Sequence, residues 1–520
     1  MAASVDLHTI SKVANRAIPA LAVLFFLGGT YVNFYFHFLT VIFILLTVLN
    51  IFYMFVQKKH TILRNFGILG QARYIIESIG PEMRQYLFAN DTEEKPFSRV
   101  ERSEIYRKAK GIDSASSFGS QMNFDNAEVK IRHSMYPVDK KDLTHFELVF
   151  GIERGCENPY TMTKPFAVSA MSFGALGENA VRALSRGAKA AGILMNTGEG
   201  GTPKHHMQEG GDLIFQMGTA KFGVRNDDSS LNDDKLRELA QQESIKMIEV
   251  KLSQGAKPGK GGLLPKEKIS KEISELRGVP MGKDVVSPAH HIECTDSGST
   301  VRFIKRVQDV SQLPVGIKLC IGCLEEFREF VLEMKAQDVF PDYIAIDGAE
   351  GGTGAAPKAF MDGYGMPLFP ALYAADAILK EEGVRMRTKI IAAGKLINSS
   401  RQFIALAIGA DAIYSARGFM LALGCIQALQ CGNNTCPVGI TTHDPSLQKG
   451  LVIENKARRV ENYVNGLESD FYQMLAASGL NDVANLTIDN LYVPADTALS
   501  GQIDALKNEV LTTEAPNLNS

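Results

Sequence analysis

The alternation of short β-branched runs with longer amphipathic stretches is the feature of this sequence that most constrains its fold. It begins near Pro165, where the character of the chain changes. Continued over about 270 residues, the pattern favours a parallel sheet with crossover helices, and its length suits a (β/α)8 TIM barrel with insertions, an α/β fold. The expected strands are residues 166–170, 193–196, 247–252, 315–319, 343–347, 389–393 and 412–415. Helix-like segments are residues 324–336, 370–380 and 400–408.

Two apolar stretches lie near the start of the chain. Residues 34–56 contain no acidic or basic side chain apart from His37. As a helix this stretch would be about 34 Å long, enough to cross a bilayer. Residues 17–32 are shorter and are interrupted by Gly28 and Gly29. Basic residues flank the pair, with Lys12 and Arg16 before it and Lys58, Lys59 and Arg64 after it. The pattern predicts a transmembrane hairpin whose two ends lie in the cytoplasm.

Three other interpretations of these stretches remain. A cleaved signal peptide fits poorly, because the apolar region is too long and no small-residue cleavage site follows it. A buried core hairpin fits poorly too, since core helices are rarely apolar on all sides. In a third variant only residues 34–56 span the membrane, and residues 17–32 lie in its interface.

The overall composition is that of an ordinary globular protein and excludes several classes. The chain has 55 Lys and Arg against 58 Asp and Glu, a net charge of −3, which argues against a nucleic-acid binder. No G-x-G-x-x-G opens a helix after an expected strand, and no G-K-[ST] occurs, so neither a dinucleotide site nor a P-loop is expected. We expect an anchor (1–60), a connector with a helical pattern at 71–87 (61–155), the barrel (156–450) and a helical tail (451–520).

Glycines gather where the expected strands end, in residues 197–201, 255–262 and 348–354. Glycine at such a position lets the backbone approach a ligand closely, and barrel active sites are built on this face. Gly394 and Arg417 fall in the loops after the seventh and eighth strands, where barrels usually hold phosphate. We therefore expect a phosphate group held by backbone N–H groups and Arg417.

Three of the seven cysteines lie within twelve residues, as Cys425, Cys431 and Cys436 with Pro437 after the last. Closely spaced thiolates followed by Pro are typical of iron–sulfur loops. Three local ligands suit a [3Fe–4S] cluster, or a [4Fe–4S] cluster with its fourth ligand elsewhere. Zinc and purely structural thiols remain alternatives.

The other cysteines and a histidine pair carry weaker signals. Cys320 and Cys323 form a C-x-x-C at an expected strand end, which we interpret as buried thiols rather than a redox or metal site. Cys156 and Cys294 are isolated and expected to be structural. His205 and His206 are adjacent, an unfavourable spacing for one metal, and are expected to lie in a loop.

Together these residues resemble the FMN-binding synthase domain of glutamate synthase, especially the short membrane-anchored members without a glutaminase domain. The similarity covers residues 160–450, in the order of the family's motifs. The matching segments are AMSFGAL at 170–176, NTGEGG at 196–201, KFGV at 221–224, KLSQGAKPGKGG at 251–262, SPAHH at 287–291, EGGTGAAP at 350–357 and GCIQALQCGNNTCPVG at 424–439.

The resemblance implies a barrel with FMN at its mouth and a [3Fe–4S] cluster beside it. The family makes L-glutamate by reducing 2-iminoglutarate, formed from 2-oxoglutarate and ammonia, with electrons here expected from a donor protein. The cluster ligands carried over are Cys425, Cys431 and Cys436. The residues in FMN-contacting segments are Ser172, Gln254, Lys318, Gly351, Gly352, Gly394 and Arg417. Those at the family's 2-oxoglutarate site are Glu199, Lys257 and Arg277. A homo-oligomer is compatible with this assignment.

The residue types suit these roles, and each has a plainer alternative. Lys257 and Arg277 would bind a dicarboxylate, Lys318 would stabilise negative charge on the reduced flavin, and Glu199 would position or protonate the imine nitrogen. Alternatively, Arg277 caps an expected helix at 266–276, Lys257 is a solvated loop residue, and Glu199 only supports its glycine loop.

Three departures from the family bear on the substrate. The chain opens with the apolar stretches rather than a glutaminase domain, so ammonia is expected to arrive free or from a partner. Leu263 replaces a Gln expected to contact substrate. This loss of a hydrogen bond, together with the anchor, favours the alternative of a related membrane-linked flavin oxidoreductase that acts on another amino or imino acid, such as an N-substituted glutamate. Asp347 and Glu350 add two carboxylates near the flavin. A non-enzymatic membrane scaffold is disfavoured by the intact cysteine and glycine loops.

Overall fold

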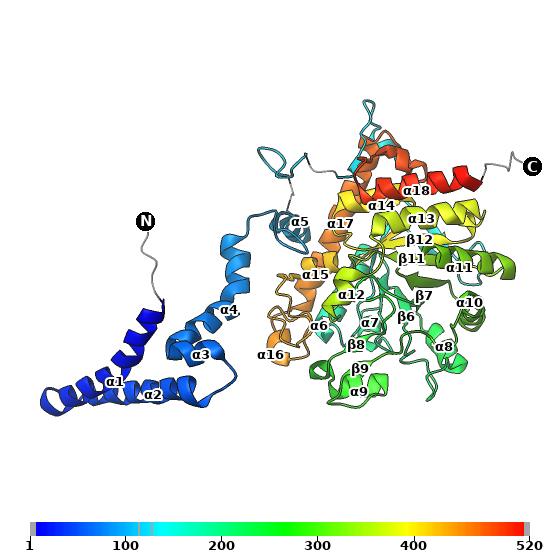
Figure 1. Cartoon of the computed structure of the whole chain (residues 1–520). Coiled ribbons are helices and arrows are strands. Elements are labelled where there is room, and N and C mark those ends of the chain that lie inside the picture. Colours follow the sequence, from blue (N-terminus) through cyan, green and yellow to red (C-terminus); the bar gives the residue numbers. More distant parts are fainter. Residues whose placement is uncertain (1–6, 113–114, 126–127, 514–520) are drawn as a thin grey trace, which may run out of the picture. The chain divides into compact units, whose positions relative to one another are not determined.

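The computed structural model describes residues 7–112, 115–125 and 128–513. The chain forms two compact units, Met1–Ser98 and Arg99–Ser520 (Figure 1). The boundary between them falls inside the segment expected to be a connector. We describe each unit by itself.

The first unit begins with two long apolar helices. α1 (Leu7–Tyr31) and α2 (Phe36–Ile51), which continues as η1 (Phe52–Val56), pack against each other through rings such as Phe25 and Phe43, 5.3 Å apart. Ile10–Tyr31 and Phe36–Val56 are long and apolar enough to cross a membrane, and only 11% of each is buried. This exposure argues against the buried core hairpin. Three short elements and one longer helix follow: α3 (Thr61–Phe66), η2 (Gly67–Gly70), α4 (Gln71–Met83) and η3 (Arg84–Phe88).

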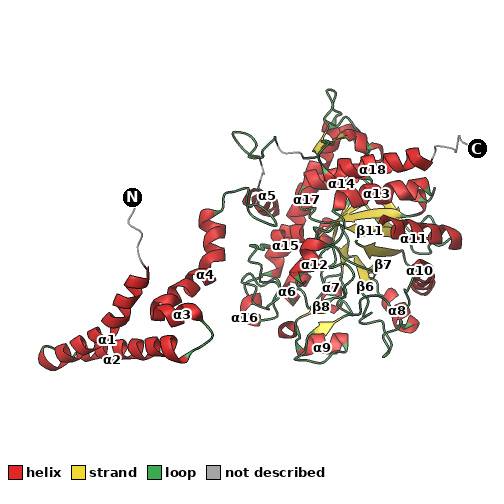
Figure 2. Ribbon diagram, viewed as in Figure 1, coloured by secondary structure: helices red, strands yellow, loops and turns green. Residues whose placement is uncertain are grey.

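The second unit is built on a closed barrel of eight parallel strands, which confirms the predicted TIM barrel (Figure 2). In chain order the strands are β4 (Phe166–Val168), β5 (Met195–Asn196), β6 (Leu213–Met217), β7 (Ile245–Lys251), β10 (Val315–Leu319), β11 (Tyr343–Asp347), β12 (Lys389–Ala393) and β13 (Ala412–Ser415). β13 pairs with β4 and so closes the barrel. β7 pairs with β10, although the longest connection between neighbouring strands, residues 252–314, separates them in sequence. Seven of the eight strands are expected from the sequence, and β6 is the one that was missed.

Helices cover the barrel, as the crossover rule requires. The expected helical segments appear as α11 (Leu324–Gln337), α13 (Leu368–Glu381) and α14 (Ser399–Ile408), beside α6 (Glu178–Ala191), α8 (Asp233–Ala240) and α10 (Ser297–Ser311). The helix expected at 266–276 is wrong in its bounds. A 3-10 turn, η5 (Lys266–Lys268), precedes α9 (Lys271–Arg277), because the Ser270 side chain accepts the Ile273 N–H and starts a new helix there.

The amino-terminal end of the barrel is closed by a hairpin of β2 (Leu148–Phe150) and β3 (Tyr160–Met162). The Phe150 ring packs edge-on against the fully buried Tyr343, 5.6 Å away, at the centre of the core. α5 (Arg99–Ala109) and α17 (Ile453–Ala477) pack together on the outside of this unit. The opposite, carboxyl-terminal end of the strands therefore remains for a site.

Candidate functional site

The expected site residues all follow or end elements at the carboxyl-terminal edge of the barrel. Ser172 lies in the loop after β4, Glu199 in the loop after β5, and Gln254 and Lys257 in the loop after β7, while α9 ends at Arg277. Lys318 lies in β10, and Gly351 and Gly352 lie in the loop after β11. Gly394 follows β12, and Arg417 begins α15 (Arg417–Leu423) after β13. Gly394 and Arg417 do follow the seventh and eighth strands.

The first group of polar contacts centres on Glu199. Its Oε1 lies 2.9 Å from Nζ of Lys251, and the same ammonium donates to Oε1 of Gln254 at 2.6 Å. Burial raises the pKa of the Glu199 carboxyl, but the charges of Lys251, Lys257 and Arg277 outweigh it and hold that pKa below its usual range. Glu199 is therefore an anion enclosed by cations.

Two of these cations are buried with few partners. Lys257 is 4% exposed and donates to the carbonyl of Ala355 at 3.3 Å. Burial, and then the charge of Lys251, lowers the pKa of Lys257 to about 8. Arg277 donates from Nη2 to the carbonyl of Phe173 at 2.8 Å, and burial lowers its pKa to about 10. Within the described part of the chain, its buried Nε has no hydrogen-bond partner.

These positions bear on the plainer alternatives. Lys257 is buried and so is not a solvated loop residue. The guanidinium of Arg277 reaches the carbonyl of Phe173 rather than its own helix end. Lys251, Lys257 and Arg277 together face one carboxylate, so the group carries an excess of positive charge that a dianion would neutralise.

A second group lies after β10, β11 and β13. Lys318 is buried, with its Nζ 3.7 Å from Oδ2 of Asp347 and 6.0 Å from the centre of the Tyr414 ring. A Cβ on Gly352 would lie 2.9 Å from Nε of Arg417, so glycine lets this loop lie against the guanidinium without displacing it. Gly394 has φ +136°, a conformation that favours glycine, and lies against the backbone of Gly348.

The two additional carboxylates have structural partners. Oδ2 of Asp347 accepts the backbone N–H of Gly255 at 3.1 Å, as well as facing Lys318. Oε2 of Glu350 accepts the N–H of Leu368, the first residue of α13, at 3.0 Å. Glu350 therefore caps a helix, and a carboxylate at that position also suits the helix dipole.

Residues 425–436, which we call the Cys loop, follow α15. Burial raises the pKa of Cys425 to about 11, and the other two thiols of the loop act on it electrostatically. The loop turns sharply at three non-glycine residues with positive φ, Gln427, Leu429 and Asn434. Among residues 7–112, 115–125 and 128–513, no three His, Cys, Asp or Glu side chains are grouped to hold a metal ion.

The loop between β4 and α6 (residues 169–177, the β4 loop) is held by its backbone carbonyls. Four of these oxygens accept from side chains of other segments: Met171 from His206 at 3.1 Å, Phe173 from Arg277 at 2.8 Å, Gly174 from His443 at 3.0 Å, and Ala175 from Lys268. The Lys268 ammonium also donates to the carbonyl of Cys431 at 3.2 Å. One short loop thus joins the Cys loop to the Arg277 side of the site.

Below the site, a carboxylate lies inside the barrel. Glu249, which is fully buried in β7, accepts from Asn196 at 2.8 Å, Gln216 at 2.7 Å and the Tyr414 hydroxyl at 2.9 Å. Burial raises the pKa of Tyr414 well above its usual value, so Tyr414 remains a donor. This hydrogen-bond network holds the side chains below Lys318 and Lys251 in fixed positions.

Sequence reasoning missed Lys251, Glu249, Lys268 and His443. The first two carried a readable signal, because Glu249 and Lys251 are two residues apart on a strand face whose other residues, Ile245 and Met247, are apolar. Lys268 and His443 carried none, since their partners are backbone atoms far away in sequence.

The remaining sequence expectations give a mixed result. Cys156 and Cys320 are buried free thiols, whereas Cys294 and Cys323 are only partly buried. The loop expected at His205 and His206 is wrong: both are buried in a short helix, α7 (Lys204–Met207). Burial explains this, because the His205 ring packs 4.4 Å from Phe173 and Nε2 of His206 donates to the β4 loop.

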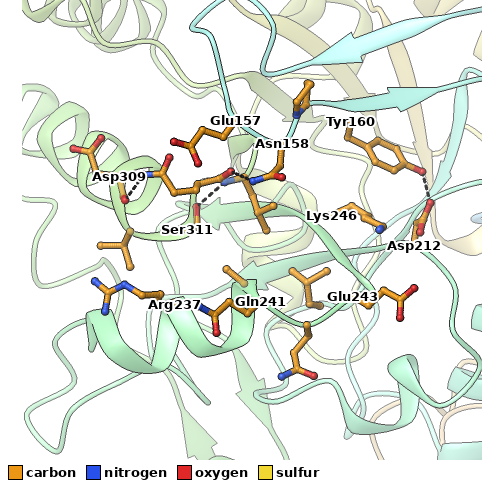
Figure 3. Close-up of a pocket in the computed structure, with 17 residues that line it drawn as sticks. Glu157, Asn158, Tyr160, Asp212, Arg237, Gln241, Glu243, Lys246, Asp309 and Ser311 are labelled. Carbon is orange, nitrogen blue, oxygen red and sulfur yellow. Dashed lines mark hydrogen bonds between the residues drawn. The ribbon is translucent and has the colours of Figure 1, made fainter.

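A cavity of about 1030 Å³ opens at the other end of the barrel (Figure 3). Its walls come from the starts of β6, β7 and β10 and from the turn before β3, and Figure 3 shows Tyr160 pointing to Asp212, whose Oδ2 it contacts at 2.8 Å. The amino-terminal face of a TIM barrel contributes to stability rather than to catalysis. We therefore place the candidate site at the opposite end.

Comparison with known proteins assigns the class. The family model for the conserved region in glutamate synthase matches residues 102–481, and the chain belongs to this family of oxidoreductases. It is 38% identical over 495 residues to the glutamate synthase large subunit-like protein YerD of Bacillus subtilis, covering 88% of this chain and 94% of that protein. It is 36% identical over 322 residues to an archaeal NADPH glutamate synthase of Methanocaldococcus jannaschii, covering 62% of this chain and 60% of that protein.

Among solved structures, a flavocytochrome b2 mutant with benzoylformate aligns with a TM-score of 0.47 at 16% identity. The alignment covers 86% of this chain and 92% of that one.

Proposed function

We propose that this chain reduces 2-iminoglutarate, formed from 2-oxoglutarate and ammonia, to L-glutamate, using FMN and an iron–sulfur cluster. The observation that carries the proposal is the group of three buried cations around Glu199, with a guanidinium nitrogen on Arg277 that has no partner among the described residues. A dicarboxylate would supply the missing negative charge and the missing acceptor.

The loops after β10, β11, β12 and β13 fit FMN. Close approach at Gly352 and the positive φ of Gly394 leave backbone where side chains would otherwise stand. Arg417 would hold the phosphate and Lys318 would face the ring system, while Ser172 and Gln254 line the opposite loops. Bound there, the flavin would supply the hydride that the imine carbon receives.

The chain's own residues would bind and orient the substrate. Lys257 and Arg277 would hold the carboxylates, and Glu199, fixed by Lys251, would position the nitrogen. Condensation of the keto group with ammonia releases water, and reduction of the C=N bond takes up two electrons and two protons. Enclosure by buried side chains strengthens these charge contacts.

The Cys loop fits the cluster, with Cys425, Cys431 and Cys436 as ligands. A buried cation, Lys268, donates to its backbone and would favour the negative charge of a thiolate cluster. We infer that electrons enter here from a donor protein. Cys431→Ser should remove the broad visible iron–sulfur absorbance and retain the flavin bands, whereas Cys156→Ser, at a buried thiol in the turn before β3, should retain both. If Cys431→Ser kept both signals, or lost both, this ligand assignment would be contradicted.

One observation favours a second substrate. Gly262 lies against the Glu199 carboxylate, where a Cβ would be 2.5 Å from Oε1, and the half-buried side chain of Leu263 follows it. An apolar group near the nitrogen position would tolerate an N-alkyl substituent, so an N-substituted glutamate is the alternative product.

The test of both candidates is anaerobic. The bound flavin is first reduced, and its reoxidation is then followed with 2-oxoglutarate plus ammonia or plus methylamine. Faster reoxidation with ammonia supports glutamate synthesis, and faster reoxidation with methylamine supports the alternative. No reoxidation by either mixture would overturn both proposals.

We also propose that α1 and α2 anchor the protein in the membrane, with the barrel in the cytoplasm. Their length, their apolar character and their exposure support this, as do the basic residues at both ends of the pair.

A further inference from the structure

Helix α4 presents an apolar stripe that the other elements of the first unit leave exposed. Ala72, Ile75, Ile76, Ile79 and Met83 recur at the three- and four-residue spacing of one helix face. Ile75, Ile76 and Ile79 are 54%, 62% and 47% exposed. Just beyond, in η3, Leu87 is 70% exposed and Tyr86 is 52% exposed. An unpartnered apolar face of this extent is a feature of interaction surfaces.

The opposite side of α4 has partners within the first unit. The Tyr74 ring packs edge-on against His60, 5.2 Å away, and Gly70 at the start of the helix lies against the backbone of Ile62. Arg73 and Glu77 pair at 2.8 Å on the polar side. These contacts fix the rotation of α4 and leave its apolar stripe directed away from α3.

Charge and sequence position indicate what covers the stripe. Only residues 57–70 separate α4 from the end of the second apolar helix, so α4 stays close to the membrane that the anchor would enter. Between residues 57 and 88 the basic side chains are Lys58, Lys59, Arg64, Arg73 and Arg84, and the acidic ones are Glu77 and Glu82. The positive charge is concentrated before α4, at Lys58, Lys59 and Arg64, and an apolar helix stripe that follows basic residues is typical of a segment in the headgroup region of an anionic bilayer.

A second copy of the chain is a less suitable occupant. Helix pairing in water relies on an apolar repeat sustained over three or more heptads. The stripe of α4 covers about three turns, and Gly80 and Pro81, two residue types unfavourable in a helix interior, lie within it.

We propose that α4 is an interfacial helix, with Ile75, Ile76 and Ile79 inserted among the lipid headgroups of a bilayer that contains anionic lipid. This inference rests on the membrane anchor proposed above. Inserted in this way, α4 lies flat on the cytoplasmic surface and supplies a second membrane contact besides the transmembrane pair.

The chain contains no tryptophan, so one substitution creates a unique fluorescent probe in the full-length protein. Three variants serve: Ile79→Trp in the stripe, Glu77→Trp on the polar face, and Val41→Trp on the exposed side of α2. Each is reconstituted into vesicles of phosphatidylcholine and phosphatidylglycerol, with and without bromine on the acyl chains near the headgroups. Bromine quenches tryptophan only at close range.

We expect emission of Ile79→Trp to be blue-shifted and about two-fold lower in brominated vesicles, with Glu77→Trp unchanged. Val41→Trp should be quenched as well, because it reports the anchor. Quenching of Val41→Trp without quenching of Ile79→Trp would overturn the interfacial helix and leave the anchor standing. Absence of quenching in Val41→Trp would overturn the anchor and this inference together. A blue shift of Ile79→Trp without bromine quenching would mean that protein, not lipid, covers the stripe.

Discussion

The buried ammonium group of Lys268 donates a hydrogen bond to the backbone carbonyl of Cys431, 3.2 Å away. The same ammonium donates to Ala175 in the β4 loop, and the side chain is 2% exposed. Burial lowers the pKa of Lys268 to about 8, which leaves it mostly charged at neutral pH. A single cation therefore joins two loops that are 163 residues and 93 residues away from it in sequence.

Replacing Lys268 by Met should weaken this junction. Two buried carbonyls would lose their donor, at about 1–3 kcal/mol each, so we expect a melting temperature several degrees lower and less iron–sulfur absorbance per flavin. The exposed neighbour Lys266→Met is the control and should change neither quantity. Equal melting temperatures and absorbance ratios in the two variants would contradict the role of Lys268.

The pKa of about 8 at Lys257 makes dicarboxylate binding sensitive to pH. The lysine is charged below that pKa and attracts a dianion, so the Kd for 2-oxoglutarate should rise as pH increases through 8. Lys257→Arg should flatten this dependence, because arginine keeps its charge. The Kd is measured from the perturbation of the flavin absorbance. A Kd that stays constant between pH 7 and 9 in the unsubstituted protein would disprove the assignment.

Neutralising the same residue separates binding from chemistry. Lys257→Gln should raise KM for 2-oxoglutarate about 10- to 100-fold, because one charge-assisted contact of about 1.5–3 kcal/mol is lost. The exposed Lys260→Gln is the matched control and should leave KM nearly unchanged. A similar KM in both variants would show that Lys257 does not contact the substrate.

Leu263→Gln tests the origin of substrate choice. A side-chain amide beside the Glu199 loop would restore a hydrogen bond near the nitrogen position, and a site that pairs polar groups discriminates more strongly than an apolar one. We expect kcat/KM with ammonia to rise about ten-fold relative to methylamine. Leu332→Gln, on the exposed surface of α11, should not alter the ratio. An unchanged ratio in Leu263→Gln would remove this residue from the specificity argument.

Glu350→Ala should act on stability rather than on the flavin. The substitution removes the acceptor of the first N–H of α13, a capping loss of about 1 kcal/mol, and should lower the melting temperature by about 2 °C. The flavin absorbance spectrum should be unchanged. A shifted flavin spectrum with an unaltered melting temperature would instead place Glu350 at the cofactor.

Much of the barrel could be predicted because its strands are short β-branched runs between glycines. The sequence did not indicate β6, because Leu213–Met217 contains only one β-branched residue, Ile214, and because the strand is buried on both of its faces. The two long apolar helices, α1 and α2, were readable from composition alone. The 3-10 turn at Lys266–Lys268 was not, since the break depends on one serine side chain capping the next helix.

Motifs in the sequence located the site, but they did not show which of its residues contact one another. Glu199 and Lys251 are 52 residues apart and meet only because β5 and β7 end at the same edge of a closed barrel. The capping role of Glu350 could not be predicted from the sequence, which indicated only a carboxylate beside glycines near the flavin. Its partner, the N–H of Leu368, is a backbone atom that no residue type reveals.

The β4 loop contacts its neighbours through main-chain oxygen atoms, and this has a consequence for how the protein can vary. Ala175 can change its side chain without disturbing the bond from Lys268, because the acceptor belongs to every residue type. Inserting or deleting a residue between Met171 and Ala175 would instead shift four acceptors at once relative to His206, Arg277, His443 and Lys268. At Ala175, therefore, the length of the loop matters more than the identity of the side chain.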